Sequence, residues 1–287
     1  MKLVSFTSDG ASRLGVLVES GVADITAIEP GLFDLVDLIA AGADFLAQVA
    51  RELASVPVIP LDSVRLEAPL RPRKNVIAIG RNYLEHVREV PGEDSATRPP
   101  PEYPMVFTKP PTSVIGPGAA IDTANDPTGT TDYEGELAVV IGQAAKRVRA
   151  EEAWDHVFGY TIVNDVTARA LQRRHVQWLI GKGPDTFCPL GPCVATADEL
   201  PDIGTVGVRT TVNGETRQDG RVADLIFDIP TLIATLSETM TLEPGDVIAT
   251  GTPSGVGAGF DPPRFLQPGD VVEVTVDGIG TLSNPVV

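Results

Sequence analysis

The stretch Asp132–Gly142 constrains the fold of this chain more than any other. Its second half is an unbroken apolar, β-branched run that ends at Gly142, which predicts a buried strand. Side chains alternate between the two faces of a strand, so Glu134 and Glu136 should point the same way. Two carboxylates at the head of a buried strand repel each other and lose hydration. They therefore need a metal ion, a shared proton or a basic side chain between them.

A second apolar strand, Phe158–Asn164, ends in another carboxylate, Asp165. Three carboxylates with open positions suit a hard divalent ion such as Mg²⁺, Mn²⁺ or Ca²⁺. Two simpler interpretations stay open at this point. The Glu-x-Glu pair is also typical of a solvated strand edge, and Asp165 is equally suited to cap the helix expected to start there.

Charge and composition exclude some classes of protein. The 287 residues include 39 acidic and 22 basic side chains, a net charge of −17, which argues against nucleic acid or an anionic membrane as partner. No apolar run is long enough for a signal peptide or a membrane span. Cys188 and Cys193 are the only cysteines, too few for a disulfide framework, and we expect reduced thiols in a cytoplasmic protein.

The order of strand and helix patterns predicts an α+β chain that is mainly β. Short strands over residues 1–27 and a helical stretch over 35–54, interrupted at Gly42, predict a small N-terminal domain at 1–65. Residues 56–73 hold four prolines and are expected to be an extended linker. The main domain is then 66–287. Its hairpin turn at Asn213-Gly214 and two Pro-Gly-Asp turns indicate a β-rich C-terminal part.

Polar side chains in three further segments are candidates for chemistry. His86 and Glu89 share one face of a short helix, as a surface pair or as a base with its orienting partner, and the Pro-rich segment 91–104 is expected to be a loop or lid. Lys182, between two glycines, is either a solvated side chain or a cation aimed at a substrate oxyanion. The Gly251–Gly259 loop is either a plain hairpin loop or a set of N–H groups that bind a carboxylate.

Taken together, these segments resemble the fumarylacetoacetate hydrolase family. The resemblance covers residues 70–287, in the family's order. It is carried by Gly80-Arg81-Asn82-Tyr83 with His86 and Glu89, by Tyr133-Glu134-Gly135-Glu136-Leu137, by Gly159-Tyr160-Thr161 with Asn164-Asp165, Ala168-Arg169 and Leu171-Gln172, by Gly181-Lys182 with Asp185–Pro192, and by Thr250–Gly257.

The resemblance implies a fold and a set of site residues. The fold would be the family's mixed β-sandwich roll, preceded by a small N-terminal α/β domain, in a homodimer. Carboxylates at Glu134, Glu136 and Asp165 would hold Mg²⁺ or Mn²⁺, with Ca²⁺ as a further option. The predicted catalytic residues are His86, Glu89 and Lys182, and the predicted substrate-binding residues are Arg81, Tyr83, Gln172 and Thr252.

The resemblance and the residues together predict a metal-dependent hydrolase that cleaves a C–C bond in an acylpyruvate-type 2,4-dioxo acid. Glu89 would orient His86 as the base for water, and the metal with Lys182 would stabilise the enolate that leaves. The alternative is an isomerase of a 2-hydroxy-dienedioate, of the kind met in aromatic catabolism, or a 2-oxo-diacid decarboxylase at the same site. A metal-binding module without catalysis is a third class, but it would not need the His86–Glu89 pair or Lys182.

Overall fold

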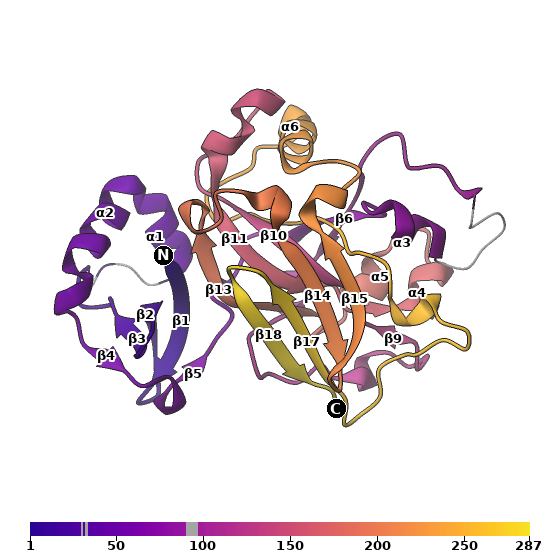
Figure 1. The fold of residues 1–287 in the computed structure, drawn as a ribbon, viewed down its shortest axis with the longest axis horizontal. Coiled ribbons are helices and arrows are strands. Elements are labelled where there is room, and N and C mark those ends of the chain that lie inside the picture. Colours follow the sequence, from indigo (N-terminus) through magenta and orange to yellow (C-terminus); the bar gives the residue numbers. More distant parts are fainter. Residues whose placement is uncertain (30, 32–33, 90–96) are drawn as a thin grey trace.

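The protein is described from a computed structural model, which covers residues 1–29, 31, 34–89 and 97–287 (Figure 1). Residues 91–96 of the segment 91–104, which is expected to be a loop or lid, lie outside the described residues. The helices are α1 (Leu35–Ala41), α2 (Ala43–Glu52), α3 (Leu84–Glu89), α4 (Arg169–Arg174), α5 (Leu179–Lys182) and α6 (Ile229–Thr239). The described part holds no helix long and apolar enough to cross a membrane.

Strands dominate the described chain. They are β1 (Lys2–Ser8), β2 (Ala11–Val18), β3 (Gly21–Asp24), β4 (Val58–Ile59), β5 (Arg65–Leu66), β6 (Val76–Gly80), β7 (Met105–Lys109), β8 (Val114–Ile115), β9 (Thr131–Asp132), β10 (Gly135–Ile141), β11 (Val157–Asn164), β12 (Thr167–Ala168), β13 (Cys188–Thr196), β14 (Gly207–Val212), β15 (Glu215–Arg221), β16 (Val247–Ala249), β17 (Val271–Val276) and β18 (Gly280–Pro285).

The strands form one large mixed sheet and two smaller sheets. The large sheet runs in the order β4-β3-β2-β1-β13-β11-β10-β16-β6-β7, and β14, β15, β17 and β18 form a separate antiparallel sheet in the order β15-β14-β17-β18. Most pairs are antiparallel, but β16 pairs with β6 in parallel. The expected α+β, mainly β fold is therefore confirmed.

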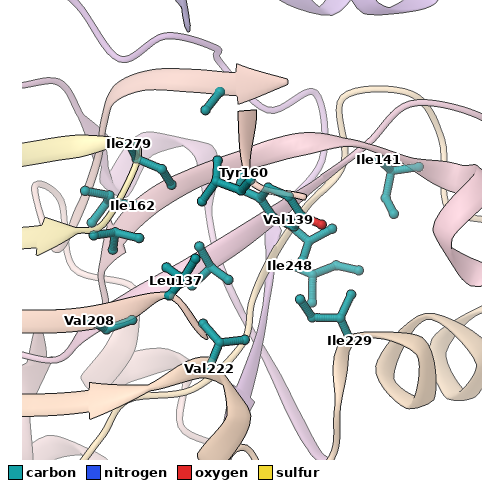
Figure 2. Packing of buried hydrophobic residues seen from close by; sticks show 14 of the residues in the cluster. Leu137, Val139, Ile141, Tyr160, Ile162, Val208, Val222, Ile229, Ile248 and Ile279 are labelled. Carbon is teal, nitrogen blue, oxygen red and sulfur yellow. The ribbon is translucent and has the colours of Figure 1, made fainter. Parts of the chain in front are cut away.

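Strand β10 lies in the middle of the large sheet and is buried on both faces. Leu137, Val139 and Ile141 face the core between the large sheet and the four-stranded sheet, beside Tyr160 and Ile162 of β11 (Figure 2). The alternate residues of β10 pack into a second cluster with helix α1. The strand predicted from its apolar run is thus confirmed. Its central position fixes the site because Glu136 lies on it and Glu134 directly precedes it.

The N-terminal segment follows the predicted order of strands and helices, and Gly42 does separate two helices. Its strands join the large sheet through β1 and β13, where Lys2 pairs with Ala195. The expected linker also contributes to this sheet, because β4 pairs with β3 and β5 with β1. The division at residue 65 stays a prediction, since one hydrogen-bonded sheet runs across it.

Candidate active site

Three carboxylates that are distant in sequence converge at the ends of β10 and β11. Glu134, Glu136 and Asp165 each offer an oxygen within 4.8 Å of the others, and all three side chains are buried. The backbone holds them in place: the Asp165 N–H donates to the Glu134 carbonyl at 2.8 Å, and the Asn164 side chain accepts from the Glu134 N–H at 3.0 Å. Asp165 is not a helix cap, because α4 begins four residues later at Arg169.

Basic side chains lie among these carboxylates. Lys182 Nζ is 2.6 Å from both Glu134 Oε2 and Asp165 Oδ2. Arg169 Nη1 is 2.6 Å from Glu134 Oε1, and its Nε is 2.8 Å from Asp132. Burial opposes the charged forms, but these partners prevail: Lys182 and Arg169 lower the pKa of Glu134, while Asp165 and Glu134 raise the pKa of Lys182.

Lys109 is a buried cation of the site that the sequence analysis did not single out. Its ammonium is fully buried, 2.7 Å from Asp165 Oδ1, and it donates to the carbonyls of Val166 and Lys182. It therefore fixes the Asp165 carboxylate and the backbone of Lys182 together. A signal was present in the sequence, because Lys109 is one of only five lysines and lies in an apolar strand before a proline.

Glu136 is the carboxylate without a cationic partner. Four buried carboxylates, including Asp132, face three buried cations, and among the described residues Glu136 forms no ion pair. It accepts one hydrogen bond, from the Gly251 N–H at 2.8 Å. Burial, and then the charges of Asp165 and Glu134, raise its pKa well above the usual value. The cluster thus has room for further positive charge.

The predicted dyad forms on α3. His86 Nδ1 lies 2.8 Å from Glu89 Oε1, and Glu89 Oε2 accepts from the Gly255 N–H at 2.7 Å. Glu89 therefore holds one ring nitrogen of His86, which leaves Nε2 available for other partners. The dyad is not a solvated surface pair, because His86 is buried.

The Gly251–Gly259 loop does bind carboxylates, but they belong to the protein itself. The Gly251 N–H bonds Glu136, the Gly255 N–H bonds Glu89, and the N–H groups of Gly257 and Ala258 bond Asp132 at 2.7 and 2.9 Å. These N–H groups already donate hydrogen bonds to acidic side chains of the site. The loop therefore positions those side chains and does not leave the same N–H groups free for a substrate.

A cavity of about 310 Å³ opens beside the carboxylates. Of the predicted site residues, those that line it are Arg81, His86, Glu134, Glu136, Gln172, Lys182 and Thr252. Asp165 and Glu89 lie behind this wall, bonded to Lys182 and His86. Tyr83 does not line the cavity; it is buried, and its backbone bridges to Leu225. The roles assigned to all these residues stay predictions.

The carboxylate cluster fits a divalent metal ion. Its donors are all oxygens, as Mg²⁺ and Mn²⁺ prefer. Asp165 Oδ1 is buried and has no aligned hydrogen-bond donor, although Lys109 lies close to it, and Glu136 lacks a countercharge. Glu134, Glu136 and Asp165 are therefore the residues that could hold the ion. The two oxygens now bonded to Lys182 belong to this set.

A buried oxygen-donor triad in such a fold is suited to metal-assisted catalysis, and comparison with known proteins identifies the family. Residues 75–287 match the family model for the C-terminal domain of fumarylacetoacetate (FAA) hydrolase. The chain is 47% identical to the oxaloacetate tautomerase YisK of Bacillus subtilis, over 94% of both chains.

Solved structures of similar proteins support the same family. A fumarylacetoacetate hydrolase from Exiguobacterium antarcticum has a TM-score of 0.86 and 43% identity, covering 100% of this chain and 99% of that one. The maleylpyruvate hydrolase of Sphingobium sp. SYK-6, in complex with manganese(II) and pyruvate, has a TM-score of 0.81 and 33% identity over 100% and 99%. The protein is therefore an enzyme of the fumarylacetoacetate hydrolase family.

Proposed function

We propose that this enzyme is a divalent-metal-dependent tautomerase that interconverts the enol and keto forms of a 2-oxo acid. The observation that carries the proposal is the placement of His86 and Lys182 in one cavity with the carboxylate triad. The reaction needs no more than a proton moved between carbon 3 and the 2-oxygen. The 47% identity to an oxaloacetate tautomerase supports this reaction ahead of the hydrolysis predicted from the sequence.

Glu134, Glu136 and Asp165 would hold the ion. A bound divalent cation would polarise the 2-oxo group and offset the negative charge that develops on its oxygen. Mg²⁺ and Mn²⁺ both suit the oxygen donors, and a related hydrolase has been solved with manganese. We propose either of these ions as the cofactor.

His86 is the proposed base at carbon 3. Its Nδ1 is held by Glu89, so Nε2 is the nitrogen that can remove a proton from carbon 3 and return it. Glu89 stabilises the imidazolium formed in between. His86 lines the same cavity as Glu136 and Thr252.

Lys182 is the proposed donor at the 2-oxygen. The charges of Asp165 and Glu134 outweigh its burial and raise its pKa, so these two carboxylates hold Lys182 in its charged form. Its ammonium is bonded to those two carboxylates. An ion held by the same carboxylates would share their oxygens with Lys182, and an N–H group released from them would be available to a substrate oxygen.

Hydrolysis of an acylpyruvate is the second candidate. The His86–Glu89 dyad could equally remove a proton from water, and the chain is 33% identical to a maleylpyruvate hydrolase. Only hydrolysis places label from ¹⁸O-water in a new carboxylate. Decarboxylation of a 2-oxo diacid would release carbon dioxide, which neither of the other reactions does.

The test supplies oxaloacetate as its enol and measures the loss of enol absorbance, with malate dehydrogenase and NADH to trap the keto form. Tautomerase activity predicts a faster appearance of the keto form, no carbon dioxide, loss of the effect with EDTA and recovery with Mn²⁺. Turnover of acylpyruvates with ¹⁸O incorporation, and no effect on the oxaloacetate enol, would instead assign the enzyme as a hydrolase.

We also propose that the enzyme is a homodimer and that residues 1–65 form a separate small domain. The dimer rests on the resemblance to the family. Light scattering coupled to size exclusion tests it, and a monomer mass of 30.3 kDa would contradict it. The domain proposal predicts that a fragment of residues 66–287 folds alone.

A further inference from the structure

Lys182 lies on a helix that is too short to hold its own position. Helix α5 is a single turn, Leu179–Lys182, and a helix of this length is not stable by itself in water. Two of its four side chains, Leu179 and Ile180, are 46% and 53% exposed, so they contribute little packing. The ammonium of Lys182 is nevertheless buried against the carboxylate triad. Contacts from other parts of the chain must therefore fix it there.

An aromatic ring of strand β7 is one of these contacts. Lys182 Nζ lies over the ring of Phe107, 4.9 Å from its centroid, which is within the range of about 6 Å for a cation–π contact. The other partners of this ammonium are the carboxylates of Glu134 and Asp165, which are also proposed metal ligands. The ring is not a metal ligand. Its contact with the ammonium therefore persists when an ion shares the two carboxylates.

Phe107 is supported in turn by Trp178, the residue that precedes α5. The centroids of the two rings are 5.3 Å apart and their planes are inclined at 63°, which is an edge-to-face pair. The Trp178 carbonyl also accepts the N–H groups of Gly181 and Lys182, both at 2.9 Å. Trp178 is thus connected to Lys182 by two routes, through the backbone of α5 and through the Phe107 ring.

The indole of Trp178 lies directly against residue 80, which has no side chain. A Cβ atom at Gly80 would be 2.5 Å from Trp178 Cζ3 and 3.0 Å from Cη2, closer than such atoms approach. Gly80 does not have a positive φ, so the close approach of the indole, and not the backbone conformation, requires glycine here. Gly80 and Trp178 both line the cavity. The indole is therefore confined between the end of β6 and the Phe107 ring of β7.

We propose that Phe107 and Trp178 are positioning residues, which keep the Lys182 ammonium directed at the 2-oxygen of the substrate when an ion shares its carboxylates. Phe107 acts on Lys182 through its ring face, and Trp178 acts through Phe107 and the start of α5. The inference rests on the proposed function in one respect, namely that Lys182 donates to the 2-oxygen.

The test is a double-mutant cycle measured by binding, so that it does not depend on which reaction the enzyme catalyses. The probe is oxalate, a planar dianion that resembles the enolate of a 2-oxo acid and cannot enolise. In calorimetric titration of Mn²⁺-saturated protein, Lys182→Met should weaken oxalate binding by about 10–100-fold. Phe107→Leu and Trp178→Leu should each weaken it by about 3–30-fold. In the Lys182→Met background, the same two substitutions should change the affinity by less than about 2-fold, because the group through which they act is gone.

Controls separate positioning from a general loss of structure. Phe107→Tyr keeps the ring face, so its oxalate affinity should return to within about 2-fold of wild type. Trp154→Leu removes the same side chain from a position that is 44% exposed and does not line the cavity, and it should have no effect. Gly80→Ala keeps both rings but displaces the indole, so it should weaken oxalate binding in the wild-type background and not in Lys182→Met.

Additive effects in the cycle would refute the proposal, because the rings would then act independently of Lys182. Normal oxalate binding by Phe107→Leu would refute it as well. Failure of the premise looks different: Lys182→Met would itself bind oxalate as wild type does, and the positioning role would fall with it. Failure of the tautomerase reaction is different again, since the oxaloacetate enol would not be turned over while the cycle would still be non-additive.

Discussion

Replacement of Lys109 by Met tests whether the buried ion pairs of the site hold the fold together. Lys109 is fully buried, contacts Asp165 Oδ1 at 2.7 Å, and donates to two backbone carbonyls. The substitution keeps the apolar stem and removes the charge. Asp165 keeps only Lys182 as a cationic partner, and two carbonyls lose a donor. Removing one partner of a buried pair costs about 3–5 kcal/mol.

This cost converts into a temperature shift. At about 2.1 cal/mol/K per residue, a chain of 287 residues has an unfolding entropy of roughly 0.6 kcal/mol/K, so Tm should fall by about 5–8 °C. The assay is thermal unfolding of metal-free protein in EDTA. Because Lys109 and a bound ion would compete for the Asp165 carboxylate, Mn²⁺ should also raise the Tm of the variant by more than it raises that of wild type.

Lys74→Met is the matched control. Lys74 also pairs with an aspartate, Asp246, at 2.9 Å, but its side chain is 43% exposed. The ammonium of this pair is open to solvent although Asp246 is buried, so the pair contributes about 1 kcal/mol and Tm should fall by only about 2 °C. If Lys109→Met lowers Tm no more than Lys74→Met does, the reasoning about the buried cluster is wrong.

Three further predictions concern the other titratable groups. Folding raises the pKa of Glu136, so its stabilising contribution is present below the unfolded-state pKa of about 4.5 and is lost as pH rises through the folded-state pKa. In urea unfolding of metal-free protein, Glu136→Gln should not show this loss of stability with rising pH. A stability–pH profile of the variant that runs parallel to that of wild type would contradict the prediction. His86→Ala should lower kcat by about 10²–10⁴-fold while calorimetry still detects Mn²⁺ binding, and full activity would exclude His86 as the base. Burial raises the pKa of Cys188 to about 12 and that of Cys193 to about 11. Neither thiol should therefore react with a disulfide reagent at pH 8 until denaturant is added. Rapid labelling of the native protein would show instead that the thiols are accessible.

Local patterns were sufficient for much of this protein. The apolar run at 137–141 predicted the central strand because a buried strand needs apolar side chains on both faces. The Asn213-Gly214 pair predicted its hairpin, since both residues adopt the positive φ that the turn requires. The Asp228 side chain caps the start of α6 by accepting from the Thr231 N–H, which is an equally local contact. These are interactions between near neighbours, and sequence spacing describes them well.

The charge balance of the site could not be predicted in this way. Lys182 reaches Glu134 across 48 positions of the chain, and Lys109 reaches Asp165 across 56, so no periodicity connects them. The Gly251–Gly259 loop was expected either to bind a carboxylate or to be inert. Only the fold shows that its N–H groups bind Glu136, Glu89 and Asp132 of the protein itself.

The sequence alone determined which carboxylates could meet a metal ion, because Glu134 and Glu136 share one face of a strand and Asp165 ends the next. Only the tertiary structure decided which cations neutralise them, that Glu136 is left without one, and that Arg81 and Arg98 line the same cavity. The physical reason is that ionisation inside a protein depends on distances and burial between segments remote in sequence, and these distances are fixed only when the sheets pack.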